Sequence, residues 1–250
     1  MPVFHHGPVE LACLDEGQGE PIVLVHGFGS SKEVNWVQPS WLTTLNGAGR
    51  RVIALDNRGH GQSTKLFDPA EYHTTKMAED VRALLDHLAV PRAAVVGYSM
   101  GARIVAFLAV AHPDRVCAMV LGGLGSHLID GVGLPESIAE ALEAPSLDDV
   151  ADPQGRMFRA FADQTRSDRR ALAACIRGSR QVLSREQAAS IRTPTLIAVG
   201  TKDPIAGSAE GLAAVMPNAR ALPIPDRDHM LAVGDKVFKA GVLEFLKEHG

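Results

Sequence analysis

Short apolar runs alternate along this chain with segments of helical periodicity, and this alternation strongly restricts the folds open to it. Such a pattern is typical of a mainly parallel sheet with helices on both faces. At 250 residues the chain is long enough for one such domain with a substantial core. We predict an α/β fold with a mainly parallel sheet of about eight strands. Seven of these strands are expected at residues 9–14, 22–25, 52–55, 93–96, 116–121, 195–199 and 220–224.

Two amphipathic segments predict helices that pack against this sheet. In residues 77–88 the apolar side chains of Met77, Val81 and Leu84 recur at intervals of three and four. Residues 238–246 show a similar pattern and would close the fold. Neither helix indicates chemistry by its pattern alone.

A long connection separates two of the predicted strands. About 70 residues lie between Gly122 and Thr195, far more than the usual connection of 2–6 residues. Short helical runs at 137–142, 156–162 and 169–176 alternate there with glycine and proline breaks, among them Gly131, Gly133 and Pro135. We predict a small helical lid at residues 124–190, inserted after the sixth strand. The core would then comprise residues 1–123 and 191–250.

The pentapeptide Gly97-Tyr98-Ser99-Met100-Gly101 lies between an apolar run and a helix-like run. A serine on so sharp a strand-to-helix turn takes strained backbone angles, and the turn requires small neighbours. The pattern G-x-S-x-G in this setting indicates a nucleophile elbow, which exposes the serine hydroxyl to a substrate.

A serine hydroxyl becomes a good nucleophile only when an imidazole accepts its proton and an acid orients that imidazole. Asp203 follows one predicted strand directly, and His229 follows the last predicted strand. Asp130 is a poorer acid because it lies inside the presumed lid, and Asp228 adjoins the histidine too closely. We predict a catalytic triad of Ser99, His229 and Asp203.

Two backbone amides are candidates for an oxyanion hole. The segment 24–29 turns on two glycines after a predicted strand, so the N–H of Phe28 can point into the crevice. The N–H of Met100 directly follows Ser99, at the positive end of the next helix. His26 lies before the turn, where a structural hydrogen bond suits it better than a catalytic role.

The composition restricts the partners of the chain. A formal charge of −4 and scattered Lys and Arg residues argue against a nucleic-acid surface. No His or Cys residues have metal-ligand spacing, and acyl transfer through a serine requires no organic cofactor. We therefore expect no cofactor, no metal and no nucleic acid, with a small-molecule acyl substrate as partner; the oligomeric state is left open.

The cellular setting is predicted from cysteines and from leader patterns. Cys13, Cys117 and Cys175 are odd in number and lie in apolar or helical contexts, as reduced buried thiols do. The first seven residues lack the basic and apolar regions of a signal peptide. No segment reaches about 18 uninterrupted apolar residues. We expect a cytoplasmic protein with no membrane partner.

The segment 56–63, Asp-Asn-Arg-Gly-His-Gly-Gln-Ser, is similar to the D-x-R-G-x-G-x-S loop of the α/β-hydrolase superfamily. The elbow and the order Ser, Asp, His along the chain add to this similarity. Essentially the whole chain therefore resembles that superfamily, in its serine hydrolase branch. In the family this loop is chiefly structural, so the resemblance implies no catalytic part for Asp56, Arg58 or His60. The resemblance is specific for fold and triad and poorly specific for substrate.

The resemblance implies hydrolysis of a small carboxylic ester, thioester or lactone through an acyl-enzyme. Because Ser99 replaces the aspartate nucleophile, the haloalkane dehalogenase and epoxide hydrolase branches are disfavoured. Carbon–carbon bond hydrolysis or enol-lactone opening in aromatic catabolism stays open, although the carbon–carbon hydrolases usually differ at the positions of Tyr98 and Phe28. A third possibility is a ligand receptor that retains the triad.

Several arginines near the predicted site receive a structural interpretation. Arg103, one turn beyond Ser99, is expected to form an ion pair. Phe158 and Phe161, three apart in a helical run, are expected to serve mainly in packing. The lid arginines are interspersed with aspartates and are expected on a solvated face; they are Arg156, Arg159, Arg166, Arg169, Arg170 and Arg177.

Overall fold

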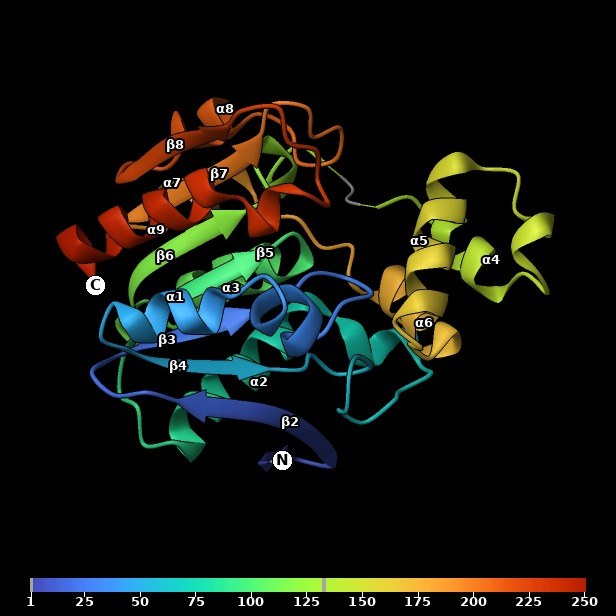
Figure 1. Cartoon of the computed structure of the whole chain (residues 1–250), viewed down its shortest axis with the longest axis horizontal. Coiled ribbons are helices and arrows are strands. Elements are labelled where there is room, and N and C mark those ends of the chain that lie inside the picture. Colours follow the sequence, from blue (N-terminus) through green and yellow to red (C-terminus); the bar gives the residue numbers. More distant parts are fainter. Residues whose placement is uncertain (1, 132–133) are drawn as a thin grey trace.

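A computed structural model describes residues 2–131 and 134–250, which form an α/β fold around a twisted sheet (Figure 1). Met1 and the predicted glycine break at Gly133 lie outside the described residues. The strand order is β1-β2-β4-β3-β5-β6-β7-β8, with β1 and β2 antiparallel to their neighbours and the others parallel. This confirms the predicted mainly parallel sheet. The strands are β1 (Val3–His6), β2 (Val9–Glu16), β3 (Glu20–Val25), β4 (Arg50–Leu55), β5 (Ala93–Tyr98), β6 (Val116–Gly122), β7 (Thr195–Gly200) and β8 (Ala219–Ile224).

The central strands were predictable because they are apolar on both faces. Every residue of β5 and of β7 is buried, as expected for parallel strands covered by helices on both sides. The sequence prediction missed β1, which is four residues long and buries only Phe4. Its single buried side chain gives no alternating pattern long enough to indicate a strand.

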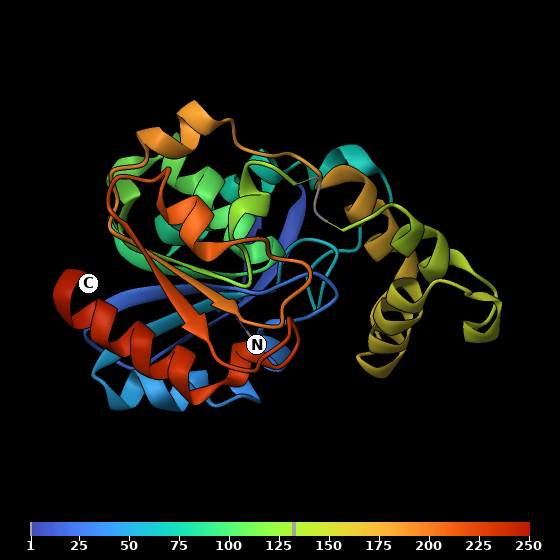
Figure 2. The same ribbon diagram turned by 90° about the horizontal axis from the view of Figure 1, so that it is seen from above.

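Helices cover both faces of the sheet, as predicted. In β3 the side chains of Val23 and Val25 join one apolar core, whereas Ile22 and Leu24 join a second core on the opposite face. Figure 2 shows α1 and α9 on one side of the sheet, with α3 on the other. The α-helices of the described residues are α1 (Trp41–Gly47), α2 (Thr74–His87), α3 (Met100–Ala111), α4 (Ser137–Glu143), α5 (Pro153–Gln164), α6 (Arg169–Gly178), α7 (Arg185–Ser190), α8 (Ala209–Ala213) and α9 (Lys236–His249).

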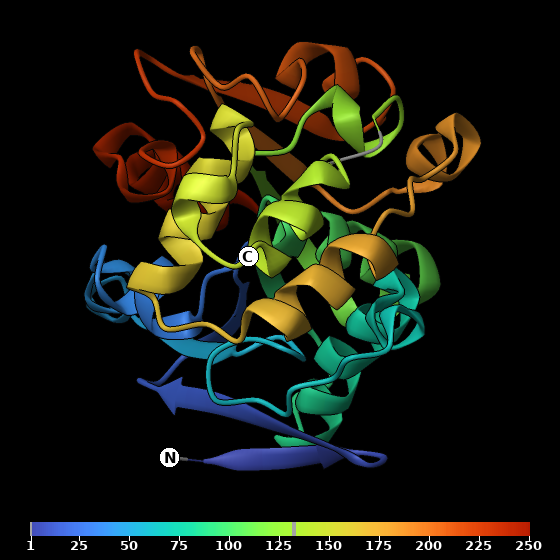
Figure 3. The same cartoon turned by 90° about the vertical axis from the view of Figure 1, so that its right-hand side faces the viewer.

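Three helices inserted between β6 and β7 lie beyond the carboxyl ends of the strands (Figures 1 and 3). They are α4, α5 and α6, and each contains one of the helical runs predicted from the sequence. The carboxylate of Asp152 caps α5 by accepting the N–H of Gly155, and Asp168 caps α6 through the N–H of Ala171. We call these three helices the lid.

The helix α7 lies apart from the lid, although the predicted lid segment included it. Its buried Ala188 belongs to the core on the side of α3, and α7 contacts α3 directly. The exact domain boundaries at residues 124 and 190 therefore stay a prediction. Among the described residues, no helix is both long and apolar enough to cross a lipid bilayer.

Candidate active site

The turn between β5 and α3 places Ser99 in a backbone conformation that is unusual for a side-chain-bearing residue. Its φ is 54° and its ψ is −113°, a region that glycine adopts far more readily. A Cβ at Gly97 would lie 2.3 Å from the carbonyl oxygen of Gly101, and one at Gly101 would lie 2.0 Å from the carbonyl oxygen of Val25. Both glycines are therefore required for the tight approach of strand and helix.

The structure brings together the three residues of the predicted triad. The Nε2 atom of His229 lies 2.9 Å from the hydroxyl oxygen of Ser99, and its Nδ1 lies 2.8 Å from Oδ2 of Asp203. Ser99 follows β5, Asp203 follows β7 and His229 follows β8. The carboxyl ends of parallel strands share one edge of a sheet, which explains how such distant residues meet.

The carboxylate of Asp203 is held rigidly on its other side. Its Oδ1 atom accepts the N–H groups of Ile205 and Ala206, at 2.8 and 3.1 Å, and its side chain is fully buried. A carboxylate only accepts hydrogen bonds, so Nδ1 of His229 must donate to it. The opposite nitrogen, Nε2, is then free to accept the proton of the Ser99 hydroxyl.

The two acids that sequence reasoning set aside lie elsewhere. Oδ1 of Asp228 accepts the N–H groups of Met230 and Leu231, so this residue shapes the loop that follows it. Asp130 is exposed, in the connection that leads to the lid. No sequence pattern singled out Tyr98 as a supporting residue, yet its hydroxyl donates to the backbone carbonyl of His229 at 2.5 Å.

The two backbone N–H groups predicted to form the oxyanion hole make no hydrogen bond to the described part of the protein. Among the described residues, the N–H groups of Phe28 and Met100 have no acceptor in the protein. Met100 is the first residue of α3, where backbone N–H groups lack partners within the helix. The positive end of the helix dipole also favours a negative charge at this point.

The loop that carries Phe28 is fixed by hydrogen bonds. Nδ1 of His26 bonds to the carbonyl of Gly27 at 2.8 Å, and Nε2 accepts the N–H of Asn57 at 2.9 Å. Oδ1 of Asn35 accepts the N–H of Gly27 at 2.9 Å. His26 therefore has the structural role expected for it. Asn35, which no sequence pattern singled out, also shapes this loop.

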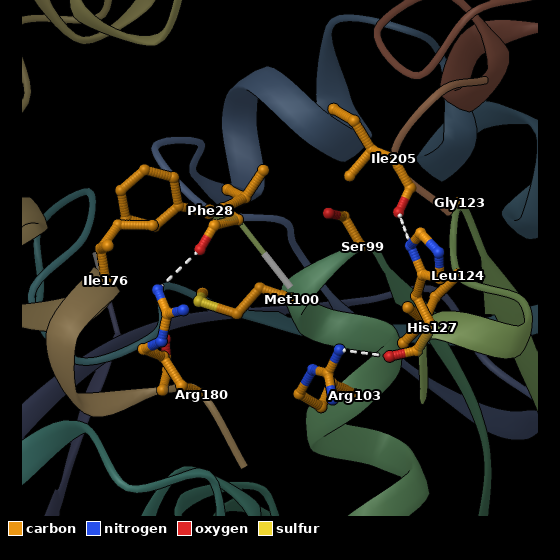
Figure 4. Close-up of a pocket in the computed structure, with 12 residues that line it drawn as sticks. Phe28, Ser99, Met100, Arg103, Gly123, Leu124, His127, Ile176, Arg180 and Ile205 are labelled. Atoms are coloured by element: carbon orange, nitrogen blue, oxygen red, sulfur yellow. Dashed lines mark hydrogen bonds between the residues drawn. The ribbon is translucent and has the colours of Figure 1, made fainter. Parts of the chain in front are cut away.

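Two cavities are lined in part by Ser99. The larger has a volume of about 290 Å³, and His229 and Phe161 line it. The smaller has a volume of about 50 Å³, and Met100 and Arg180 line it (Figure 4). Ser99 and Phe28 line both cavities, so a substrate attacked by the serine can extend into each of them.

The prediction that Arg103 forms an ion pair is wrong. Its guanidinium donates to the backbone carbonyls of Gln181 and His127, at 2.7 and 2.9 Å, and it has no acidic partner among the described residues. Burial in this uncharged setting lowers the pKa of Arg103 to about 10. The side chain therefore joins α3 to the segments that border the lid.

Several lid arginines form contacts within the lid. Arg159 is buried against backbone carbonyls and pairs with Asp163 at 3.0 Å, and Arg177 forms a two-pronged pair with Glu143. The burial of Arg159 corrects the expectation of a solvated face for that residue. Phe158 packs in the core against Phe28, as expected, and both Phe158 and Phe161 also line the larger cavity beside Ser99.

The segment 56–63 is a structural loop, as the resemblance implied. The carboxylate of Asp56 pairs with the buried ammonium group of Lys32 at 2.8 Å, and Arg58 forms two 2.7 Å hydrogen bonds with Asp80. Burial lowers the pKa of His60 to about 3, so its imidazole is neutral. In the part of the chain that the structure describes, no group of three or more His, Cys, Asp or Glu residues could hold a metal ion.

Comparison with known proteins agrees with the fold. Residues 20–175 match the family described as alpha/beta hydrolase fold. The chain belongs to this family. The match covers the elbow and the loop of Phe28, whereas Asp203 and His229 lie beyond it.

Individual relatives carry different activities in their names. A dihydrolipoyllysine-residue acetyltransferase component of an acetoin cleaving system, from Pseudomonas putida, is 33% identical, with 92% of this chain and 64% of that protein covered. Epoxide hydrolase B of Mycobacterium tuberculosis is 41% identical over 42% of this chain and 28% of that protein. The chain thus spans less than two thirds of the length of these curated relatives. A hydrolase from Pseudomonas aeruginosa PA01 shares the fold, with a TM-score of 0.81, 27% identity and coverage of 98% and 97% of the two chains.

Proposed function

We propose that this protein is a serine hydrolase that cleaves a small carboxylic ester, thioester or lactone through an acyl-enzyme intermediate. In this proposal Ser99 is the nucleophile, His229 the general base and acid, and Asp203 the residue that orients His229. The observation that carries the proposal is the continuous hydrogen-bonded chain of these three side chains at 2.9 and 2.8 Å. It ends beside two cavities and near two backbone N–H groups, those of Phe28 and Met100, that have no acceptor among the described residues.

The first half of the reaction forms the acyl-enzyme. The hydroxyl oxygen of Ser99 attacks the substrate carbonyl while Nε2 of His229 accepts the hydroxyl proton. The resulting oxyanion accepts hydrogen bonds from the N–H groups of Phe28 and Met100. When the bond from carbon to the leaving oxygen or sulfur breaks, His229 returns the proton to the leaving group.

The second half releases the acid. A water molecule gives a proton to His229 and attacks the acyl carbon, and the same two amides hold the second oxyanion. The bond from carbon to the oxygen of Ser99 then breaks, and His229 protonates that oxygen. The net reaction adds one water to the substrate and yields an acid with an alcohol from an ester, an acid with a thiol from a thioester, or a single hydroxy acid from a lactone, so no cofactor is required.

We also infer that the protein works in a reducing, cytoplasmic compartment, on a free small molecule. The support is the set of free cysteines, of which Cys13 and Cys175 are buried. Burial raises the pKa of the Cys175 thiol to about 12, which keeps it unreactive at neutral pH. Fractionation of cells with an antibody against the protein tests this inference; recovery in an exported fraction would contradict it.

A panel of substrates tests the proposed function. It contains short-chain p-nitrophenyl esters and thioesters, a lactone, an enol-lactone and a dienoic diketo acid, assayed with the native protein, Ser99→Ala and Ser190→Ala. Ser190 is exposed and far along the chain from the site, so its variant controls for loss of a hydroxyl. We expect ester or lactone hydrolysis that Ser99→Ala abolishes and Ser190→Ala preserves.

The same panel separates the alternatives. Exclusive turnover of the diketo acid or the enol-lactone would favour aromatic catabolism and overturn the broader ester assignment. Ligand binding without turnover, with a lid change that requires a partner protein, would favour a receptor. Equal turnover by the native protein and Ser99→Ala would exclude the proposed mechanism altogether.

A further inference from the structure

The two cavities beside Ser99 differ in their access to His229. During acylation the leaving group receives its proton from Nε2 of His229, so it must lie against that imidazole. His229 lines the larger cavity and is absent from the lining of the smaller one. The leaving group therefore belongs in the larger cavity, and the acyl group extends into the smaller one, past Met100.

The smaller cavity is narrow and suits a short acyl group. Its volume of about 50 Å³ gives room for roughly three or four water-sized groups. Phe28, Leu124 and Ile176 form apolar walls, whereas Arg103 and Arg180 contribute guanidinium groups to the lining (Figure 4). No aspartate or glutamate of the described residues lines this cavity.

Most hydrogen-bond donors of Arg180 have no partner among the described residues. Its NH1 group donates to the backbone carbonyl of Leu134 at 2.9 Å, and no carboxylate of the described residues lies within ion-pair distance. Arg177, one turn earlier in the chain, is fully paired with Glu143 by contrast. A guanidinium has five N–H donors in a planar fork that matches a carboxylate.

Arg103 adds a second positive charge that has no counter-ion in the part of the chain that the structure describes. Its side chain is 5% exposed and bonds only to carbonyl oxygens, so its charge is buried and uncompensated among the described residues. An unpaired buried charge is costly, and its interaction with an opposite charge is strong where water is excluded. The positive charges of Arg103 and Arg180 therefore favour a negatively charged group in the smaller cavity.

We propose that the smaller cavity binds an acyl group that ends in a carboxylate, and that Arg180 pairs with that carboxylate. The substrate class is then an ester or thioester of a short dicarboxylic acid, such as a malonyl or succinyl half-ester. Its leaving group occupies the larger cavity, whose walls include Phe158, Phe161 and Leu231. This inference rests on the proposed function, because it assumes that Ser99 is acylated.

A matched pair of esters tests the inference. Naphthyl hemisuccinate and naphthyl butyrate share a leaving group and differ in the terminal carboxylate. We compare kcat/KM for both with the native protein, Arg180→Gln, Arg180→Lys and Arg185→Gln. Arg185 is exposed on α7, so its variant removes the same charge outside the cavity.

We expect the native protein and Arg185→Gln to prefer the hemisuccinate. Arg180→Gln should reduce that preference about 10- to 100-fold, as loss of a charged hydrogen-bonded pair does. Its loss of hemisuccinate hydrolysis should exceed any loss of butyrate hydrolysis by that factor, and Arg180→Lys should restore part of the preference. Equal losses for both esters, or no native preference for the hemisuccinate, would overturn the inference.

Binding to the inactive Ser99→Ala variant distinguishes the two proposals. We expect monomethyl succinate to bind it more tightly than methyl butyrate, and a second change, Arg180→Gln, to remove the difference. That result together with no turnover by the native protein would contradict the proposed function while supporting the carboxylate site. Hydrolysis of the butyrate ester through Ser99, together with equal binding of monomethyl succinate and methyl butyrate, would support the proposed function and contradict the carboxylate site.

Discussion

The hydroxyl oxygen of Ser99 lies 2.9 Å from Nε2 of His229, although 130 positions separate the two residues in the chain. The parallel sheet explains this approach, because β5 and β8 both end at the edge that the lid overhangs (Figure 1). The same edge carries Asp203 after β7. The geometry of one sheet edge therefore determines the chemistry that we propose.

Asp203→Asn should reduce kcat for ester hydrolysis about 10³- to 10⁴-fold at neutral pH. The backbone N–H groups of Ile205 and Ala206 would hold the amide oxygen, so the amide nitrogen would face Nδ1 of His229. That contact forces the imidazole into the tautomer that cannot accept the serine proton. Steady-state kinetics measure the effect. Asp228→Asn should retain activity within a few-fold of the native protein, and comparable losses in both variants would contradict the assignment of Asp203.

Ser99→Gly should be more stable to unfolding than Ser99→Ala. Ser99 has a φ of 54° and a ψ of −113°, which alanine adopts with strain and glycine adopts readily. Strain of this kind costs about 1–3 kcal/mol, partly offset by the greater freedom of glycine in the unfolded chain. Urea unfolding of the two inactive variants measures the difference, and a lower midpoint for Ser99→Gly would argue against a strained elbow.

Gly101→Ala should destabilise the fold by about 3 kcal/mol or more, because overpacking against backbone has no easy relief. The new Cβ would meet the carbonyl oxygen of Val25 at 2.0 Å. Gly47→Ala is the matched control, since nothing lies within 4 Å of its Cβ position in α1. Gly47→Ala should be neutral or stabilise the protein by up to about 1 kcal/mol. Similar denaturation midpoints for both variants would contradict the close packing of α3.

The stability of the protein should fall between pH 7 and pH 5. The pKa of His60 is lowered to about 3 by burial, whereas an unfolded histidine has its ordinary value of 6.5. The unfolded state thus binds more protons below pH 6.5, so stability is complete above that pH and declines towards pH 3. One such histidine accounts for a loss of about 2 kcal/mol between pH 7 and pH 5.

Urea unfolding at both pH values checks this effect. His60→Gln should reduce the pH dependence by the contribution of one histidine, whatever its effect on absolute stability. His26 should contribute in the same direction, because burial also lowers its pKa. An unchanged pH dependence in His60→Gln would show that His60 does not titrate as the structure requires.

The fold was largely predictable because parallel strands and amphipathic helices leave clear patterns. Continuous apolar runs marked β5 and β7, and a regular apolar stripe marked α2. By contrast, β1 buries a single side chain and left no such pattern. The placement of α7 beside α3 depends on tertiary packing, which segment length alone does not indicate.

The candidate site was predictable where local sequence determines the chemistry. The elbow at Ser99 depends on neighbouring glycines, and Asp203 and His229 lie in the loops that follow β7 and β8. The supporting roles of Tyr98 and Asn35 were not predictable in this way. Tyr98 contacts His229, which is distant in the chain, and Asn35 contacts Gly27 across a loop. Residue type alone also fails to distinguish a paired arginine from an unpaired one, because its partner is determined by the fold.

Labelling with a fluorophosphonate tests most directly whether Ser99 is a nucleophile activated by His229. Peptide mapping by mass spectrometry locates the adduct, and the labelling rate is compared for the native protein, Ser99→Ala and His229→Gln. We expect a single adduct on Ser99, no adduct in Ser99→Ala and labelling at least about 10²-fold slower in His229→Gln. Labelling of another residue, or an unchanged rate in His229→Gln, would contradict the account.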